Sequence, residues 1–122
     1  FSRSQRLLHS TEFNLVKGQG RRAGAQHFVL LGLGNAHGFS RLGLIVSRKV
    51  GNAVRRNSVK RKIREWFRSE GPGPTGMDLV VIARRGADSV PTDQVASELS
   101  RASKRLQNYV DSTAGDRDSQ DV

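Results

Sequence analysis

The sequence predicts a single α+β domain in which helices pack against a small sheet, in the element order α-β-β-α-β-α. Short apolar runs at residues 27–33, 41–47 and 77–84 are bounded by turn-forming residues, as strands are. Segments with a helical spacing of apolar residues precede, separate and follow these runs. The length of 122 residues leaves room for one such domain and not for two.

The first half of the chain has clear element boundaries. Ser10 or Thr11 can cap a short first helix, and Gly18 or Gly20 can end it. Residues 34–40 are turn formers that join the first two predicted strands, so the sequence predicts a hairpin there. These two strands are then expected to lie side by side in the sheet.

The second half begins with Asn52, which fits the N-cap of a helix over residues 52–68, a stretch without Gly or Pro. A loop rich in Gly and Pro at 71–76 separates this helix from the third strand. The last helix opens at Pro91 and Thr92, and its apolar residues alternate between spacings of four and three. These apolar residues are Val95, Leu99, Ala102, Leu106 and Tyr109. The stripe can bury one face of the last helix against the sheet.

Charge is the main feature of the composition, with 21 Lys and Arg against 11 Asp and Glu and a net charge of +10. Such a chain is expected to bind polyanions. Residues 111–122 hold four Asp and no aromatic residue, which predicts a disordered acidic tail after a single domain over 1–110. No apolar run reaches the roughly 20 residues of a membrane span. We therefore expect a cytoplasmic protein without a membrane partner.

The positive charge is concentrated on the turn and helix at 48–68, which hold nine basic residues against one acid, Glu65. A turn of about 100° per residue puts Val59, Ile63 and Trp66 on one arc and the cations on the opposite face. Solvated helix faces usually mix both signs, because like charges one turn apart repel. This imbalance favours an anionic partner, and Arg suits the planar geometry of phosphate.

Residues 43–64 read G-L-I-V-S-R-K-V-G-N-A-V-R-R-N-S-V-K-R-K-I-R, and this stretch resembles the signature of the bacterial ribonuclease P protein subunit. In that family a strand leads into a Lys/Arg-Val/Ile-Gly-Asn-Ala-Val turn and then into a helix with an Arg-Asn-Arg-x-x-Lys-Arg-x-x-Arg pattern. The D-L-V-V-I-A-R run at 78–84 also matches. The resemblance covers about residues 4–110.

The resemblance implies both a fold and a function. The fold is an α-β-β-β-α-β-α arrangement with a small mixed sheet and a left-handed β-α-β crossover, like a domain of a small-subunit ribosomal protein and domain IV of elongation factor G. The function is that of the ribonuclease P protein subunit, an endoribonuclease only as part of a ribonucleoprotein. It binds the catalytic RNA and the 5′ leader of precursor tRNA and assists Mg²⁺-dependent removal of the leader. The resemblance implies no catalytic residue in the chain, Mg²⁺ held mainly by the RNA, and one protein copy per holoenzyme.

The resemblance also implies two sets of site residues. The RNA-binding set consists of Arg48, Lys49, Asn52, Arg55, Arg56, Asn57, Lys60, Arg61, Arg64 and Arg68. The leader cleft consists of Phe13, Lys17, Phe28 and Leu31. The region of Asn57 is a candidate for a weak Mg²⁺ site shared with phosphate.

Three positions depart from the family pattern. Ser58 stands where the family usually has Arg, and Lys17 and Leu31 stand where it has aromatic residues of the leader cleft. An ammonium group in place of an aromatic ring would exchange base stacking for a phosphate contact. Leader binding would then depend more strongly on salt.

Two other functions are compatible with the fold and the charge. One is a non-enzymatic RNA-binding protein of the ribosomal kind, and the other is a nonspecific DNA-compacting protein. The second is disfavoured because the charge is concentrated on one turn-helix unit. The G-N-A turn at 51–53, joined to the R-N and K-R pairs at 56–57 and 60–61, favours ribonuclease P over both.

Overall fold

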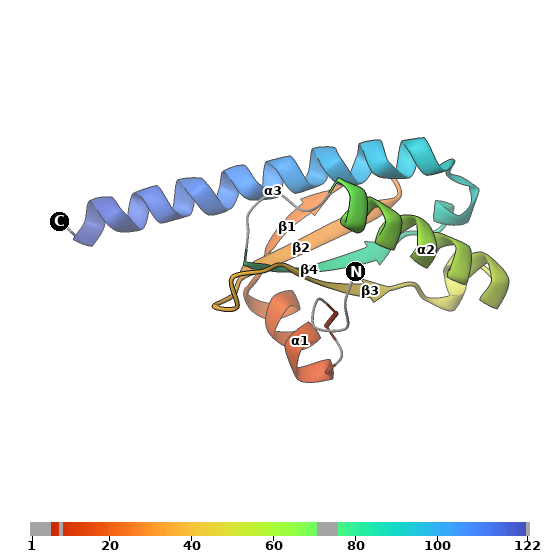
Figure 1. The fold of residues 1–122 in the computed structure, drawn as a ribbon, viewed down its shortest axis with the longest axis horizontal. Coiled ribbons are helices and arrows are strands. Elements are labelled where there is room, and N and C mark those ends of the chain that lie inside the picture. The colour runs from red at the N-terminus through yellow and green to blue at the C-terminus, as the bar shows by residue number, and fades with distance from the viewer. Residues whose placement is uncertain (1–5, 8, 71–75, 122) are drawn as a thin grey trace.

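The computed structural model describes residues 6–7, 9–70 and 76–121, and residues 109–121 by their backbone alone. In this part of the chain, helices and strands follow one another as α1, β1, β2, β3, α2, β4 and α3 (Figure 1). The helices are α1 (Ser10–Gln19), α2 (Ala53–Ser69) and α3 (Thr92–Asp121). The strands are β1 (Arg21–Gly24), β2 (Phe28–Gly34), β3 (Arg41–Ile45) and β4 (Met77–Ala83). The predicted α+β class is confirmed.

The four strands form one mixed sheet in the order β1-β2-β4-β3. Strand β2 runs antiparallel to β1 and β4, and β3 runs parallel to β4 through the crossover helix α2. The predicted hairpin between residues 27–33 and 41–47 is wrong, because β4 lies between these two strands. The physical reason is the apolar character of β4, in which Val80 and Val81 are both fully buried. A strand that is buried on both faces belongs in the centre of a sheet.

Strand β1 is the additional strand that the resemblance implied and the residue pattern did not show. Its sequence is R-R-A-G, and only Ala23 is buried. Such a short polar stretch gives no periodic signal. It becomes a strand by pairing with β2, from Arg21 opposite Gly32 to Gly24 opposite Val29.

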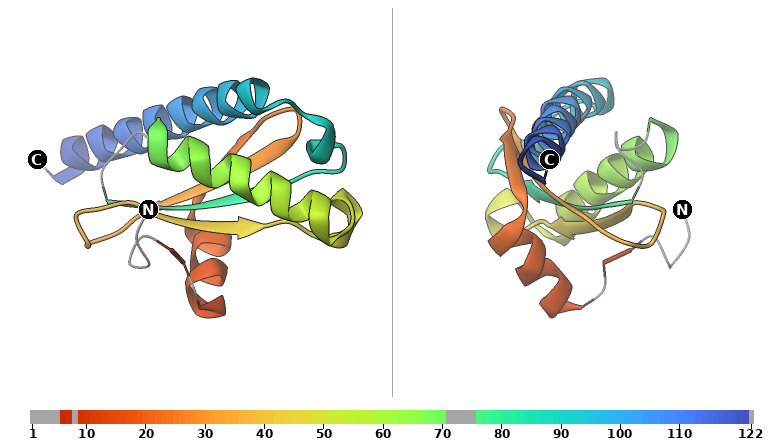
Figure 2. Two further views of the ribbon diagram at one scale, coloured as in Figure 1. Left: turned by 45° about the vertical axis from the view of Figure 1, so that its right-hand side comes forward. Right: turned by 90° about the vertical axis from the view of Figure 1, so that its left-hand side faces the viewer.

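The sheet separates two hydrophobic cores. Helices α2 and α3 cover one of its faces and α1 covers the other (Figure 2). Successive residues of β2 point into the two cores in turn, because side chains alternate between the two faces of a strand. Phe28 and Leu30 face α2 and α3, whereas Val29 and Leu31 lie in the core beneath α1.

The local predictions for the two long helices are confirmed. Asn52 caps α2, and its side-chain oxygen accepts a hydrogen bond of 2.9 Å from the Arg55 backbone N–H. The buried residues of α2 are Val59, Ile63, Trp66 and Phe67. The buried apolar residues of α3 are Val95, Leu99, Ala102 and Leu106. The side chain of Tyr109 lies outside the described residues. Trp66 also ties α2 to α3, because its indole N–H donates to Ser100 Oγ at 2.9 Å.

Helix α3 continues to Asp121, whereas the sequence predicted a disordered tail from residue 111. The prediction rested on composition, since residues 111–122 offer few apolar side chains to bury. Composition does not itself interrupt a helix, and the stretch contains no proline. The division of the chain at residue 110 stays a prediction.

No helix within the described residues combines the length and the apolar character that crossing a membrane requires.

Candidate RNA interface

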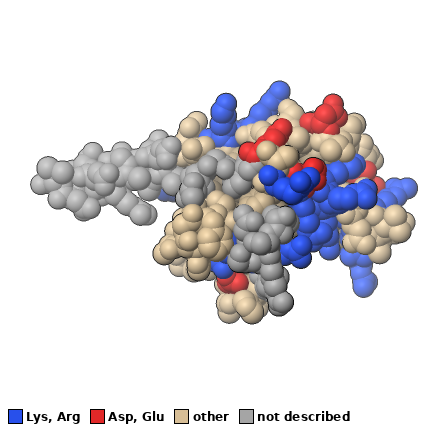
Figure 3. Space-filling model, in the orientation of Figure 1, with Lys and Arg blue, Asp and Glu red and all other residues tan. Residues whose placement is uncertain are grey.

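Helix α2 and the turn before it carry a cationic surface, which we call the basic face. It consists of Arg48 and Lys49 in the turn and of Arg56, Asn57, Lys60, Arg61 and Arg64 in α2. Lys and Arg atoms gather where α2 lies in the view of Figure 3. Arg61 and Arg64 are exposed, and neither forms an ion pair with an acid of the described residues. Like charges on neighbouring turns repel, so this surface is suited to an anionic ligand that offsets the repulsion.

Two of the predicted RNA-binding cations already hold an acid. Arg55 Nη1 lies 3.1 Å from Asp88 Oδ2, and Arg68 Nη2 lies 2.5 Å from Glu65 Oε1. The hydrogen bond between Arg68 and Glu65 lowers the pKa of Glu65 and raises the pKa of Arg68. Both arginine side chains remain more than half exposed, at 65% and 59%. These two arginines would have to exchange a carboxylate for a phosphate, whereas Arg61 and Arg64 would not.

The remaining predicted RNA-binding residues lie at the start of α2 and in the turn before it. Arg48, Lys49 and Asn57 are exposed. Arg56 is partly buried, and its Nε is enclosed without a hydrogen-bond acceptor among the described residues. An enclosed donor without a partner is costly to the fold. Asn52 is exposed as well, but its side-chain oxygen is engaged in capping α2.

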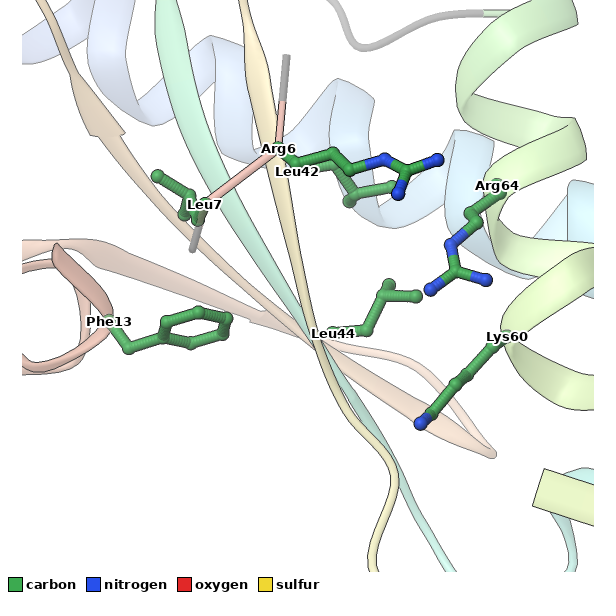
Figure 4. A pocket seen from close by; sticks show the side chains of 7 residues that line it. All are labelled: Arg6, Leu7, Phe13, Leu42, Leu44, Lys60 and Arg64. Atoms are coloured by element: carbon green, nitrogen blue, oxygen red, sulfur yellow. The ribbon is translucent and has the colours of Figure 1, made fainter. Parts of the chain in front are cut away.

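A hollow of about 190 Å³ lies along β3, between α1 and α2, and we call it the β3 hollow. It is lined by Arg6, Leu7, Phe13, Leu42, Leu44, Lys60 and Arg64. Figure 4 shows Leu44 extending from β3 toward α2 and the Phe13 ring reaching β3 from the α1 side. The Arg6 side chain extends from the N-terminal segment toward α2, and the Arg64 and Lys60 side chains extend from α2 toward β3 (Figure 4). Apolar surface bordered by cations suits a nucleotide, whose base has an apolar face and whose phosphate is an anion.

The Phe13 ring lies directly against the backbone of β3. A Cβ atom at Gly43 would be only 2.6 Å from each of two carbons of the ring. Position 43 therefore needs a glycine for the ring to rest where it does. The absence of a side chain there makes the close approach of α1 to the edge strand possible.

The structure brings only one of the four predicted leader-cleft residues to the β3 hollow, namely Phe13. Lys17 is exposed on α1 but does not line the hollow, and Leu31 is buried beneath α1. Phe28 is fully buried and faces α2 and α3, on the other side of the sheet from Phe13. The structure therefore does not bring Phe28 to the β3 hollow. The reason is strand alternation, which sends neighbouring residues to opposite faces.

Four residues of the β3 hollow were not predicted: Arg6, Leu7, Leu42 and Leu44. Arg6 forms a parallel β-bridge with Leu42, which brings the N-terminal segment to the edge of β3. It also lines a second hollow with Arg61, Arg64, Glu65 and Arg68. No local signal marks Arg6, since its neighbours in space come from distant parts of the chain. Alternation in the predicted strand 41–47 could have shown that Leu42 and Leu44 share a face.

Comparison with known proteins decides between the functions that the sequence left open. The family model described as Ribonuclease P matches residues 1–107. The chain belongs to the ribonuclease P protein family. The ribonuclease P protein component of Citrifermentans bemidjiense is 37% identical over 106 residues, which cover 87% of this chain and 91% of that one. That of Thermotoga maritima is 43% identical over 86 residues, covering 70% and 74%.

Solved ribonuclease P proteins have the same fold. The structure from Thermotoga maritima has a TM-score of 0.74 at 38% identity and covers 82% of this chain and 96% of that one. A structure from Staphylococcus aureus has a TM-score of 0.76 at 34% identity, covering 82% and 93%. This chain thus has the role of the protein subunit of ribonuclease P, the ribonucleoprotein endoribonuclease that removes 5′ leaders from precursor tRNA. An RNA partner within the holoenzyme follows from that role.

Proposed function

We propose that the basic face binds the catalytic RNA of ribonuclease P and that the β3 hollow receives the 5′ leader of precursor tRNA. One observation supports this most directly: two cations of the basic face, which form no ion pair with a described acid, also line the hollow. Lys60 and Arg64 belong to both surfaces. Helix α2 would thereby contact both RNAs, so that the leader lies next to the catalytic RNA.

The two surfaces would use different chemistry. On the basic face, guanidinium and ammonium groups contact phosphates and release the counterions that the phosphates hold, which makes binding depend on salt. Among the described residues that line the β3 hollow, Phe13 has the one aromatic ring, so it stacks on one base, and stacking contributes about 1–3 kcal/mol per base. Lys60, Arg64 and Arg6 would contact the phosphates on either side of that base.

We also propose that the Mg²⁺ ions of the reaction are bound mainly by RNA. Mg²⁺ prefers oxygen ligands and stabilises the charge that develops on the reacting phosphate. Near Asn57, the helical neighbours Arg56, Lys60 and Arg61 are cations, which do not fit a metal site built from protein alone. Among the described residues, no group of three or more His, Cys, Asp and Glu side chains could hold a metal ion. We therefore give Asn57 the role of an RNA contact.

In this proposal the holoenzyme contains one copy of the chain for each catalytic RNA and works in the cytoplasm. The basic face and the β3 hollow share Lys60 and Arg64, so both RNAs are bound by the same copy. Its two partners are then the catalytic RNA and precursor tRNA.

The test compares how tightly the reconstituted holoenzyme binds precursor tRNA with a leader of several nucleotides and mature tRNA. The ratio of these two affinities is the leader increment. Phe13→Ala should reduce the leader increment by about five- to one-hundred-and-fiftyfold, the equivalent of one lost stack. Leu15→Ala is the matched control, because Leu15 is an exposed apolar residue of the same helix outside the hollow. Equal leader increments for the wild type and Phe13→Ala would refute the proposal.

A further inference from the structure

Helix α1 is tied to the sheet by an arginine at the start of β3. Arg41 donates from Nε and Nη2 to the two carboxylate oxygens of Asp78 on β4, at 2.8 and 2.7 Å. Its Nη1 lies 2.5 Å from Glu12 Oε2 on α1. Asp78 also accepts a hydrogen bond of 2.6 Å from Asn35 Nδ2. One guanidinium group therefore joins α1, β3 and β4 at a single point, which we call the Arg41 clamp.

The two carboxylates of the Arg41 clamp differ in burial. Asp78 is almost fully buried, and hydrogen bonding to it is the main reason why the pKa of Arg41 is raised, although burial opposes the rise. Loss of Asp78 would remove the more buried of the two carboxylates that hold Arg41, which is costly to the fold. Glu12 lies nearer the surface, with 24% of its side chain exposed. Its carboxylate can be removed while Arg41 remains paired with Asp78.

The Arg41 clamp holds the same two segments that hold the Phe13 ring. Phe13 follows Glu12 directly in α1, and Gly43 lies two residues after Arg41 in β3. The Phe13 ring is in close contact with Gly43, because a Cβ atom at position 43 would be 2.6 Å from the ring. A small rotation of α1 would therefore move the ring along or away from the wall of the β3 hollow.

We infer that Arg41 is a positioning residue for leader binding: through Glu12 it holds the Phe13 ring against Gly43, at the wall of the β3 hollow. This rests on the proposal that the hollow receives the leader. Arg41 acts here through the ring and not through a contact of its own with RNA, since its guanidinium group is already shared between two carboxylates.

A positioning role and simple electrostatics predict opposite results for Glu12→Gln. The substitution removes a negative charge close to a surface that binds a polyanion, so electrostatics alone predicts tighter leader binding. Loss of the clamp predicts weaker binding, because the ring is no longer held in place. The sign of the change therefore separates the two explanations.

The experiment measures the leader increment in holoenzymes carrying the wild type, Glu12→Gln, Phe13→Ala or both substitutions, at fixed salt and Mg²⁺. Glu12→Gln should lower the leader increment by about two- to fivefold, the range expected for one partly exposed ion pair. The affinity for the catalytic RNA should stay unchanged. In the Phe13→Ala background, Glu12→Gln should have no further effect, because the ring that it positions is gone. Asp93→Asn, which makes the same change of charge at an exposed position on α3, should leave the leader increment unchanged.

The outcomes separate this inference from the proposed function. If Glu12→Gln leaves the leader increment unchanged or raises it while Phe13→Ala lowers it, the positioning role is overturned and the leader site stands. An equal loss from Glu12→Gln with and without the Phe13 ring would also overturn the positioning role. If Phe13→Ala has no effect, the proposed leader site is refuted, and the inference is refuted with it.

Discussion

Arg64→Ala should weaken the binding of catalytic RNA and make that binding less dependent on the salt concentration. Arg64 is exposed, forms no ion pair with a described acid and lines two hollows. Its loss should remove about one phosphate contact and lower the slope of log affinity against log salt by about one unit. When the salt concentration rises from roughly 50 to 200 mM, a slope difference of one unit makes the ratio of the wild-type affinity to the Arg64→Ala affinity shrink about three- to fourfold. Arg64 supports no buried contact, so the free energy of unfolding should change by less than about 0.5 kcal/mol.

The assay is a salt series of equilibrium binding between the protein and the catalytic RNA, with Mg²⁺ fixed, accompanied by urea unfolding. Arg101→Ala is the matched control, because Arg101 is an exposed arginine of α3, outside the basic face, without an ion pair among the described residues. Arg61→Ala should behave like Arg64→Ala, and Arg101→Ala should leave the slope unchanged. A weaker affinity with an unchanged slope for Arg64→Ala would refute the phosphate contact. An equal flattening for Arg101→Ala would refute the special role of the basic face.

Three further predictions concern packing, pH and salt. Gly43→Ala should lower the free energy of unfolding in urea by about 1–3 kcal/mol, because the added Cβ would press on the Phe13 ring at 2.6 Å; an unchanged midpoint would contradict this. Burial tends to raise the pKa of Glu98, but hydrogen bonds from the backbone N–H and Nδ1 of His27, both 2.8 Å, lower it overall. The stabilisation by this pair is complete above the ordinary carboxyl pKa of about 4.3 and is lost as the pH falls through the lowered pKa of Glu98 in the folded protein. The free energy of unfolding should therefore fall more steeply with acid in the wild type than in Glu98→Gln. Lys17 lies outside the β3 hollow but one helical turn after Phe13, where the leader would pass as it leaves the hollow along α1. Lys17→Phe should then make the leader increment less sensitive to KCl, and identical salt dependence in both proteins would mean that Lys17 does not face the leader.

Local signals in the sequence were sufficient to locate the helices and β4, but not every helix end: α1 is capped at His9 instead of Ser10 or Thr11, and α3 continues to Asp121. Asn52 marks the start of α2 because a cap acts within one turn, and the buried arc through Val59 and Ile63 follows from helical periodicity. Strand order depends instead on pairing between distant segments. The turn formers after β2 therefore suggested a hairpin that the insertion of β4 excludes, and β1 depends on β2 for its formation.

The candidate site divides in the same way. The cations of α2 could be predicted because an excess of one charge on one helix face is visible in the sequence. The β3 hollow could not, because it combines Arg6, α1, β3 and α2, which only the fold brings together. Phe28 and Phe13 look alike in the sequence, and only the register of β2 shows that they lie on opposite sides of the sheet.

The most direct measurement is the release of the 5′ leader from precursor tRNA by a bacterial ribonuclease P RNA at low Mg²⁺, with and without the purified protein. We expect little release by the RNA alone, none by the protein alone, and full release when both are present. The Arg61→Ala/Arg64→Ala double variant should restore release only at a higher protein concentration, because its deficit lies in binding the catalytic RNA. If folded wild-type protein fails to stimulate the RNA at any concentration, the role of this chain as the ribonuclease P protein subunit is contradicted.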